Sequence, residues 1–118
     1  MEHKIEDQRL VVLIESHRDS DVEKIILNAL FKKHIPGLSV IITEYDDVTK
    51  HADDKYFYLH YAMLGVKKNR AHDIVELLKN LEKKILVSVL VPVEEKYDHI
   101  FYYNDPKVLI QKIKDLLS

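Results

Sequence analysis

The chain has 118 residues, of which 47% are hydrophobic and 32% charged, and its formal net charge is −2. This length fits a single domain, 1–118, that can bury a core without a metal or a disulfide. The absence of cysteine excludes disulfides, thiolate metal sites and a cysteine nucleophile. Gly37 and Gly65 are the two glycines, so no glycine-rich phosphate loop can be written.

The N-terminal segment is charged and lacks the apolar stretch of a secretory signal. No apolar run approaches the roughly 18–20 residues that cross a bilayer. We therefore expect a cytoplasmic protein without membrane contact, which the lack of cysteine also fits. Residues 1–8 are polar and we expect them to be flexible.

The first predicted strand, residues 10–14, is continuously apolar, which is typical of a central strand covered on both faces. A polar turn leads to a helix that begins at Ser20 and ends before Pro36. Ser20 and Glu23 have the spacing of a capping box. The predicted inner stripe of this helix consists of Val22, Ile25, Ile26, Ala29, Leu30 and Lys33.

Two strands follow, at residues 38–45 and 55–64, joined by a charged connection, 46–54, that we expect to be an exposed loop. In the second of them, alternation places Phe57 and Leu59 on a core face. The opposite face carries Tyr56, Tyr58 and His60, and it needs a covering partner.

The last part of the chain alternates again between helix and strand. A helix is predicted near 70–83, with a stripe of Ile74, Leu77, Leu78 and Leu81. A continuous apolar strand at 85–91 and a short aromatic strand at 99–103 come next. Asp105 and Pro106 predict the cap and first residue of a C-terminal helix, whose inner stripe comprises Val108, Leu109, Lys112, Ile113 and Leu116.

The predicted order, β-α-β-β-α-β-β-α, indicates an α+β fold. Its first six elements match the ferredoxin-like split β-α-β arrangement, an antiparallel sheet here extended by a C-terminal strand and helix. The alternative is a small doubly wound α/β sheet, which the continuous runs at 10–14 and 85–91 favour. The direct step between the strands at 38–45 and 55–64 argues against that alternative, because parallel strands need a long crossover.

The turn after the first strand is the first candidate site. His17, Arg18 and Ser20 lie at a predicted helix N-terminus, where a small anionic ligand is favoured. Glu15 and Asp19 have a Glu-x-x-x-Asp spacing that resembles the metal-dependent Toprim domains of topoisomerases and primases. That resemblance implies Glu15 as general acid/base. The family's glycine after the glutamate is serine here, and its Asp-x-Asp motif is not matched.

Two further candidate sites lie between residues 46 and 60. Asp46, Asp47, His51 and Asp53 are the alternative metal ligands, although their spacing fits no EF-hand. Tyr56, Tyr58 and His60 are the predicted subunit interface, because an aromatic sheet face is costly to leave in water and tyrosine is enriched at interfaces.

These features lead to the expectation of a non-catalytic regulatory module, without a cofactor, that binds a small anionic ligand or a protein and forms a dimer or trimer through its sheet face. No complete catalytic motif is present. The order of elements is similar to that of nitrogen-regulatory signal-transduction proteins, which implies a mobile partner-binding loop at 46–54. The alternatives are a metal-dependent phosphate-ester enzyme using Glu15 and Asp19, and then a single-stranded nucleic-acid binder, which the charge disfavours.

Overall fold

The computed structural model describes residues 8–62, 70–90 and 99–118. In chain order its elements are β1 (Arg9–Ile14), α1 (Ser20–His34), β2 (Ser39–Glu44), the 3₁₀ helix η2 (Tyr45–His51), β3 (Tyr56–Leu59), α2 (Arg70–Asn80), β4 (Lys84–Val89), β5 (Ile100–Tyr102) and α3 (Pro106–Leu117). Predictions for residues 1–7, 63–69 and 91–98 lie outside the described residues.

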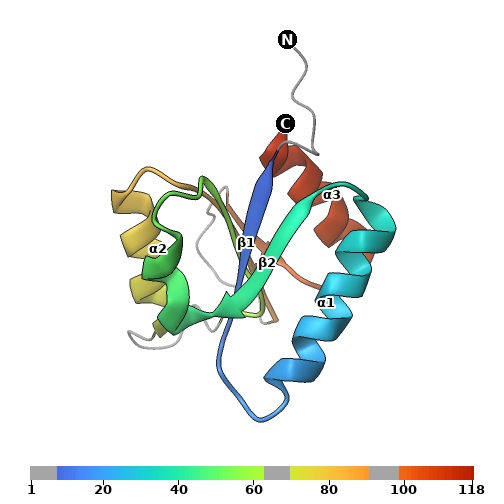
Figure 1. The fold of residues 1–118 in the computed structure, drawn as a ribbon, viewed down its shortest axis with the longest axis horizontal. Coiled ribbons are helices and arrows are strands. Elements are labelled where there is room, and N and C mark those ends of the chain that lie inside the picture. The colour runs from blue at the N-terminus through green and yellow to red at the C-terminus, as the bar shows by residue number, and fades with distance from the viewer. Residues whose placement is uncertain (1–7, 63–69, 91–98) are drawn as a thin grey trace.

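The strands form one parallel sheet in the order β2-β1-β3-β4-β5. Helices α1 and α3 cover one face, and α2 and η2 cover the other (Figure 1). This is a doubly wound, flavodoxin-like α/β fold. The prediction of an antiparallel ferredoxin-like sheet is therefore wrong, and the doubly wound alternative is the fold that the structure has.

The prediction failed at the step from β2 to β3. These strands are not neighbours, because β1 lies between them and pairs in parallel with both. The crossover is η2, whose seven residues span about 14 Å. That is enough to return along the four residues of β3, about 13 Å. The expected exposed loop is thus a short helix that buries Tyr45 and Val48 against the sheet.

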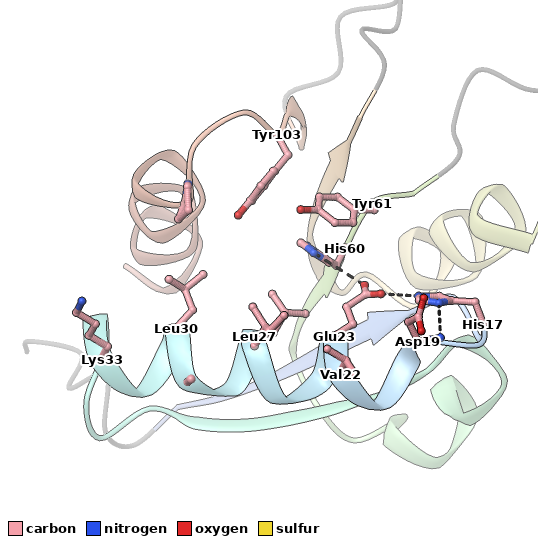
Figure 2. Close-up of a pocket in the computed structure, with 13 residues that line it drawn as sticks. His17, Asp19, Val22, Glu23, Leu27, Leu30, Lys33, His60, Tyr61 and Tyr103 are labelled. Atoms are coloured by element: carbon pink, nitrogen blue, oxygen red, sulfur yellow. Dashed lines mark hydrogen bonds and ion pairs between the residues drawn. The ribbon is translucent and has the colours of Figure 1, made fainter.

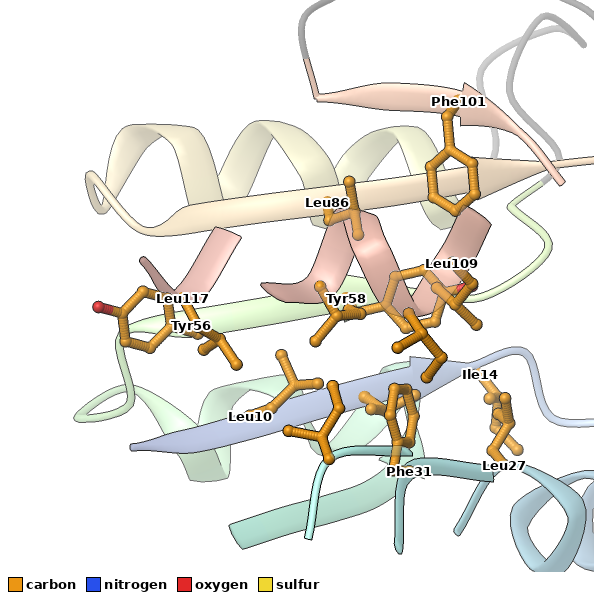
Figure 3. Packing of buried hydrophobic residues seen from close by; sticks show 14 residues of the cluster. Leu10, Ile14, Leu27, Phe31, Tyr56, Tyr58, Leu86, Phe101, Leu109 and Leu117 are labelled. Atoms are coloured by element: carbon orange, nitrogen blue, oxygen red, sulfur yellow. The ribbon is translucent and has the colours of Figure 1, made fainter. Parts of the chain in front are cut away.

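The core has two layers, one on each side of the sheet. On the α1 and α3 side, Leu10, Val12 and Ile14 pack with Tyr58 and the buried residues of both helices (Figure 3). On the other side, Val11 and Leu13 lie in the cluster formed with η2 and α2. Within β1, residues 10–14 are completely buried on both faces, which confirms the prediction made from their continuous apolar run.

Helix α1 is rotated relative to the predicted stripe. Leu27 and Phe31 are buried, whereas Val22, Ile25 and Ile26 are 55%, 69% and 62% exposed. The helix carries apolar residues on more than one side, so a helical period alone did not identify the inner one. The capping box is also absent: the N-cap is Asp19, whose side chain makes no capping hydrogen bond.

The remaining helices agree better with the sequence. The Asp105 side chain accepts a hydrogen bond from the Lys107 amide at 2.8 Å, which confirms the cap of α3. In α2, Ile74 and Leu78 are buried as predicted, but Leu77 is exposed, and so is Leu81, which follows the end of the helix. The inner residues of α3 are Leu109, Ile110, Ile113 and Leu117.

The residue before β1 is fixed by a contact with the last helix. Gln8 is buried and its Nε2 donates to the Leu117 carbonyl at 2.8 Å, so the expected flexibility does not extend to this residue. Among the helices that the structure describes, none is both long and apolar enough to cross a membrane.

Candidate functional site

The strand order reverses at β1, because the chain passes first to β2 on one side of it and then to β3 on the other. Open α/β sheets bind ligands in the crevice outside the carboxyl ends of their strands at such a switch point. Here a pocket of about 480 Å³ opens at this position (Figure 2). We call it the switch-point pocket: α1 from Val22 to Lys33 forms one wall, and residues that follow β3 and β5 form the other.

A carboxylate lies between two imidazoles at one end of the pocket. Glu23 Oε2 is 2.5 Å from His17 Nε2, and Glu23 Oε1 is 3.9 Å from His60 Nε2 (Figure 2). The Asp19 amide donates to His17 Nδ1 at 3.1 Å. His17 therefore carries its proton on Nε2 and donates it to Glu23. Glu23 does not complete the predicted capping box, because its carboxylate turns toward the two histidines.

A buried chain of hydrogen bonds orients His60. Its Nδ1 is 2.6 Å from the Tyr58 hydroxyl, which is 2.8 Å from Ser88 Oγ, and that oxygen accepts from the Tyr61 amide at 3.0 Å. The facing Glu23 carboxylate favours a proton on His60 Nε2. Tyr58 then donates to Nδ1 and Ser88 donates to Tyr58, so all donors point one way and His60 presents an N–H to the pocket.

Burial determines the ionisation of this chain. It lowers the pKa of His60 from 6.5 to about 4, so the imidazole is neutral at pH 7. It also raises the pKa of the Tyr58 hydroxyl well above its usual value, so that group keeps its proton. The pocket therefore meets a ligand with a neutral donor from His60 next to a carboxylate acceptor from Glu23.

Three aromatic rings form the wall opposite α1. The rings of His60 and Tyr61 have centroids 3.6 Å apart and are tilted by 32°, and Tyr103 stands nearly perpendicular to both, at 5.5 and 5.1 Å. Burial raises the pKa of the Tyr61 and Tyr103 hydroxyls, which therefore remain donors. Tyr61 has φ of 56°, a left-handed conformation that is uncommon for a non-glycine residue and that concentrates at functional sites.

Of the three ligand-binding residues predicted from the first turn, one lines the pocket. His17 is in the wall, whereas Arg18 is exposed and does not line it. Ser20 is buried and closes its own turn, because its Oγ accepts from the His17 amide and donates to the His17 carbonyl, both at 2.7 Å. Ser20 therefore positions His17 and does not face the pocket.

The predicted subunit interface is buried inside the chain. Tyr56, Tyr58 and His60 are 7%, 0% and 4% exposed, because the chain's own helices cover this face of the sheet. The expectation of an uncovered sheet face came with the antiparallel fold and is corrected with it. His60 instead belongs to the switch-point pocket.

The alternative metal ligands are not brought together. Asp46 pairs with Arg70, Asp47 accepts from Thr43 and pairs with Lys50, and His51 pairs with Asp54. Glu15 and Asp53 are exposed, and Asp19 lies at the rim of the switch-point pocket. Within residues 8–62, 70–90 and 99–118, no three histidine, aspartate or glutamate side chains converge as metal ligands would.

Sequence reasoning missed Glu23, Tyr61 and Tyr103. Glu23 was interpreted as part of a capping box, and both tyrosines as strand residues. The signal that identifies the two tyrosines is their position: Tyr61 is the second residue after β3 and Tyr103 the first after β5, at the edge where a parallel sheet collects its functional groups. That signal can be used only when the strands are known to be parallel.

No protein-family model matches the sequence, and no curated protein does either. Among solved structures, the chain is similar to the crystal structure of a 3-dehydroquinate dehydratase-like protein from Bifidobacterium longum, with a TM-score of 0.60 and 10% sequence identity. The similarity covers 93% of this chain and 95% of that one. At this identity it supports the fold alone.

Proposed function

We propose that this domain binds a small ring-shaped organic molecule in the switch-point pocket. The observation that carries the proposal is the convergence of the His60 N–H and the Glu23 carboxylate on a largely apolar pocket at the switch point of the sheet. Apolar pockets with a few convergent polar groups are the usual form of small-molecule sites. The left-handed backbone at Tyr61 supports the same location.

The walls indicate the chemistry of the ligand. Leu27 and Leu30 on the apolar side of α1 face the rings of Tyr61 and Tyr103 across the pocket (Figure 2). Two apolar walls of this kind suit a flat or cyclic ligand. The hydrogen-bond donors of His60, Tyr61 and Tyr103 favour a carbonyl or hydroxyl oxygen on the ligand. The Glu23 carboxylate favours a hydroxyl or amine group beside that oxygen.

The charged residues that line the pocket determine at which end an anionic group of the ligand would lie. Asp19 and Glu23 are both at one end and would repel it, whereas Lys33 lies at the other end of α1. An anionic ligand would therefore bind with its negative charge directed toward Lys33.

We also propose, from the cysteine-free composition, that the protein works in the cytoplasm.

Binding can be tested by NMR titration of the labelled protein with single-ring compounds: cyclohexanone, phenol, 4-hydroxybenzoate and 3-dehydroquinate. We expect saturable shifts at the amides of Glu23 and Tyr61 for at least one of them. Tyr103→Ala should weaken binding up to about tenfold, because an aromatic ring contact contributes about 0.5–1.5 kcal/mol and about 1.4 kcal/mol corresponds to a factor of ten. Tyr102→Ala is the matched control, since Tyr102 is the adjacent residue, is 48% exposed and does not line the pocket.

The proposal fails if none of these compounds gives saturable shifts, or if the shifts that appear lie outside the pocket. It also fails if Tyr102→Ala and Tyr103→Ala weaken binding equally, because the effect would then not come from the wall of the pocket.

A second candidate function is acid–base catalysis in the same pocket. A dehydration needs a base for a carbon-bound proton next to a carbonyl and an acid for the leaving hydroxyl, which departs as water. Glu23 next to His17 could serve as the base, and the Tyr61 or Tyr103 hydroxyl as the acid. The structural neighbour is named a 3-dehydroquinate dehydratase-like protein, and we take from that name only the choice of dehydration as the reaction to test.

Turnover can be followed by ultraviolet absorbance, because loss of water from a β-hydroxy ketone such as 3-dehydroquinate gives a conjugated product. We expect Glu23→Gln to abolish any turnover while the protein stays folded. Binding without an absorbance change would leave the first function and exclude dehydration of this compound.

A further inference from the structure

The edge of the sheet at β2 has an unusual surface. Among the described residues, strand β2 pairs only with β1, so the backbone groups on its other side meet no strand from this part of the chain. Its sequence, Ser-Val-Ile-Ile-Thr-Glu, contains neither the proline nor the lysine with which edge strands are commonly protected from pairing. A strand of this kind is suited to pair with another strand.

Helix α1 extends the same surface. A shallow groove of about 280 Å³ runs between α1 and β2, with Lys24, Ile25 and Asn28 on one side and Val40 and Ile42 on the other. The charge of Lys24 is matched within the chain, because its Nζ lies 3.8 Å from Glu44 Oε1. Ile25 is 69% exposed, which makes it the most exposed large apolar side chain on α1, and it does not line the switch-point pocket. Its exposure therefore has no explanation in the proposed ligand site.

The charges on this side of α1 are self-complementary. Asp21, Ile25, Asn28 and Lys32 follow one another at helical spacings of four, three and four residues, so they form one stripe. The spacings are the same in both directions and the two ends carry opposite charges, so in an antiparallel copy acid faces base and Ile25 faces Asn28. Both charged ends are exposed, and among the described residues neither Asp21 nor Lys32 forms an ion pair.

We propose that this edge surface, formed by β2 and by the stripe Asp21, Ile25, Asn28 and Lys32, docks against a second copy of the same chain. A two-fold axis at the midpoint of the stripe places the two α1 helices antiparallel. Each Asp21 then meets the other copy's Lys32, and each Ile25 meets the other copy's Asn28. The same axis brings the two β2 edges together in antiparallel orientation, which continues the sheet from one copy into the next.

The switch-point pocket stays accessible in this dimer. Its lining includes Tyr103 and Pro106 at the start of α3, whereas the edge surface is formed with Val40 and Ile42 of β2. The dimer is therefore independent of the proposed ligand, and each can fail without the other.

Sedimentation velocity of the full chain between 5 and 200 μM tests the dimer, the expected mass being twice 13.9 kDa. Asp21→Lys or Lys32→Asp alone should weaken association about tenfold, since each reversal turns two symmetric attractions into repulsions. The double reversal should restore association to within about threefold, because the pairing is the same with its signs exchanged.

Matched controls separate association from helix stability. Asp73→Lys reverses a first-turn acid of α2, and Lys114→Asp reverses a last-turn base of α3. Both perturb a helix dipole as the α1 variants do, but they lie away from the edge surface, so association should be unchanged. A monomeric wild type at 200 μM overturns the proposal, and so does a double reversal that fails to restore association.

A cross-linking experiment tests the register, because the chain contains no cysteine. We mix the single variants Ile25→Cys and Asn28→Cys under mild oxidation and expect an intermolecular disulfide between the two. Glu76→Cys, at an exposed position on α2, is the control for random collisions. If the Ile25→Cys and Asn28→Cys variants cross-link no faster than the control, the antiparallel arrangement is refuted. This holds even if sedimentation shows that the chain associates.

Discussion

The hydrogen-bond chain behind His60 makes a quantitative prediction for Tyr58→Phe. The substitution keeps the buried ring and removes only the hydroxyl, which contacts His60 Nδ1 at 2.6 Å and Ser88 Oγ at 2.8 Å. Each lost hydrogen bond contributes about 1 kcal/mol net, and leaving the buried His60 nitrogen without a donor adds about 1 kcal/mol or more. We expect a loss of about 3 kcal/mol and a melting temperature lower by about 10–20 °C.

Urea denaturation measures the loss, and Tyr102→Phe is the control because its hydroxyl lies on an exposed ring. The chain also predicts coupling: Tyr58→Phe and Ser88→Ala together should cost less than the sum of the two single losses, by about 1 kcal/mol. A loss below about 0.5 kcal/mol for Tyr58→Phe, or strict additivity, would show that these groups do not act as one network in the folded protein.

Three further predictions concern stability. The pKa of His60 is 6.5 in its ordinary state and about 4 in the folded chain, so the unfolded state binds more protons and stability is lost as the pH falls from about 6.5 to 4. Urea titrations at these two pH values should show a loss of about 2–3 kcal/mol, and the loss should be smaller in His60→Gln. Leu27→Ala should cost about 2–5 kcal/mol and Ile26→Ala less than about 1, because only Leu27 is buried, and equal losses would contradict the orientation of α1. Asp105→Ala should cost about 1 kcal/mol through the lost cap of α3, against almost nothing for Asp53→Ala on the surface.

The positions of the elements could be predicted from the sequence because they depend on local patterns. The apolar run at 10–14 indicated a strand buried on both faces, and Asp105 with Pro106 indicated the start of α3. The strand order could not be predicted, because it depended on residues 45–51. A 3₁₀ helix of this length is too short to show a helical period, so its sequence was read as a loop between neighbouring strands.

The candidate site depended on the same missing information. His17 could be identified because it lies in a strand-to-helix turn, which is recognisable locally. Glu23, Tyr61 and Tyr103 come from three separate parts of the chain, and only the parallel order brings them to one edge of the sheet. The orientation of α1 was equally hidden, since Val22, Ile25 and Ile26 are as apolar as the residues that are buried.

The place of β1 between β2 and β3 affects how the chain can fold. Its five consecutive buried residues, Leu10 to Ile14, are made before the other strands of the sheet, and their second neighbouring strand is complete only with Leu59. Until then β1 has one open edge and an apolar face without its cover, the condition under which nascent chains aggregate. Pairing of β1 with β2 and closure of α1 over them is the earliest arrangement that shields this strand, so the segment from Arg9 to Glu44 is expected to form the folding nucleus onto which the later strands assemble.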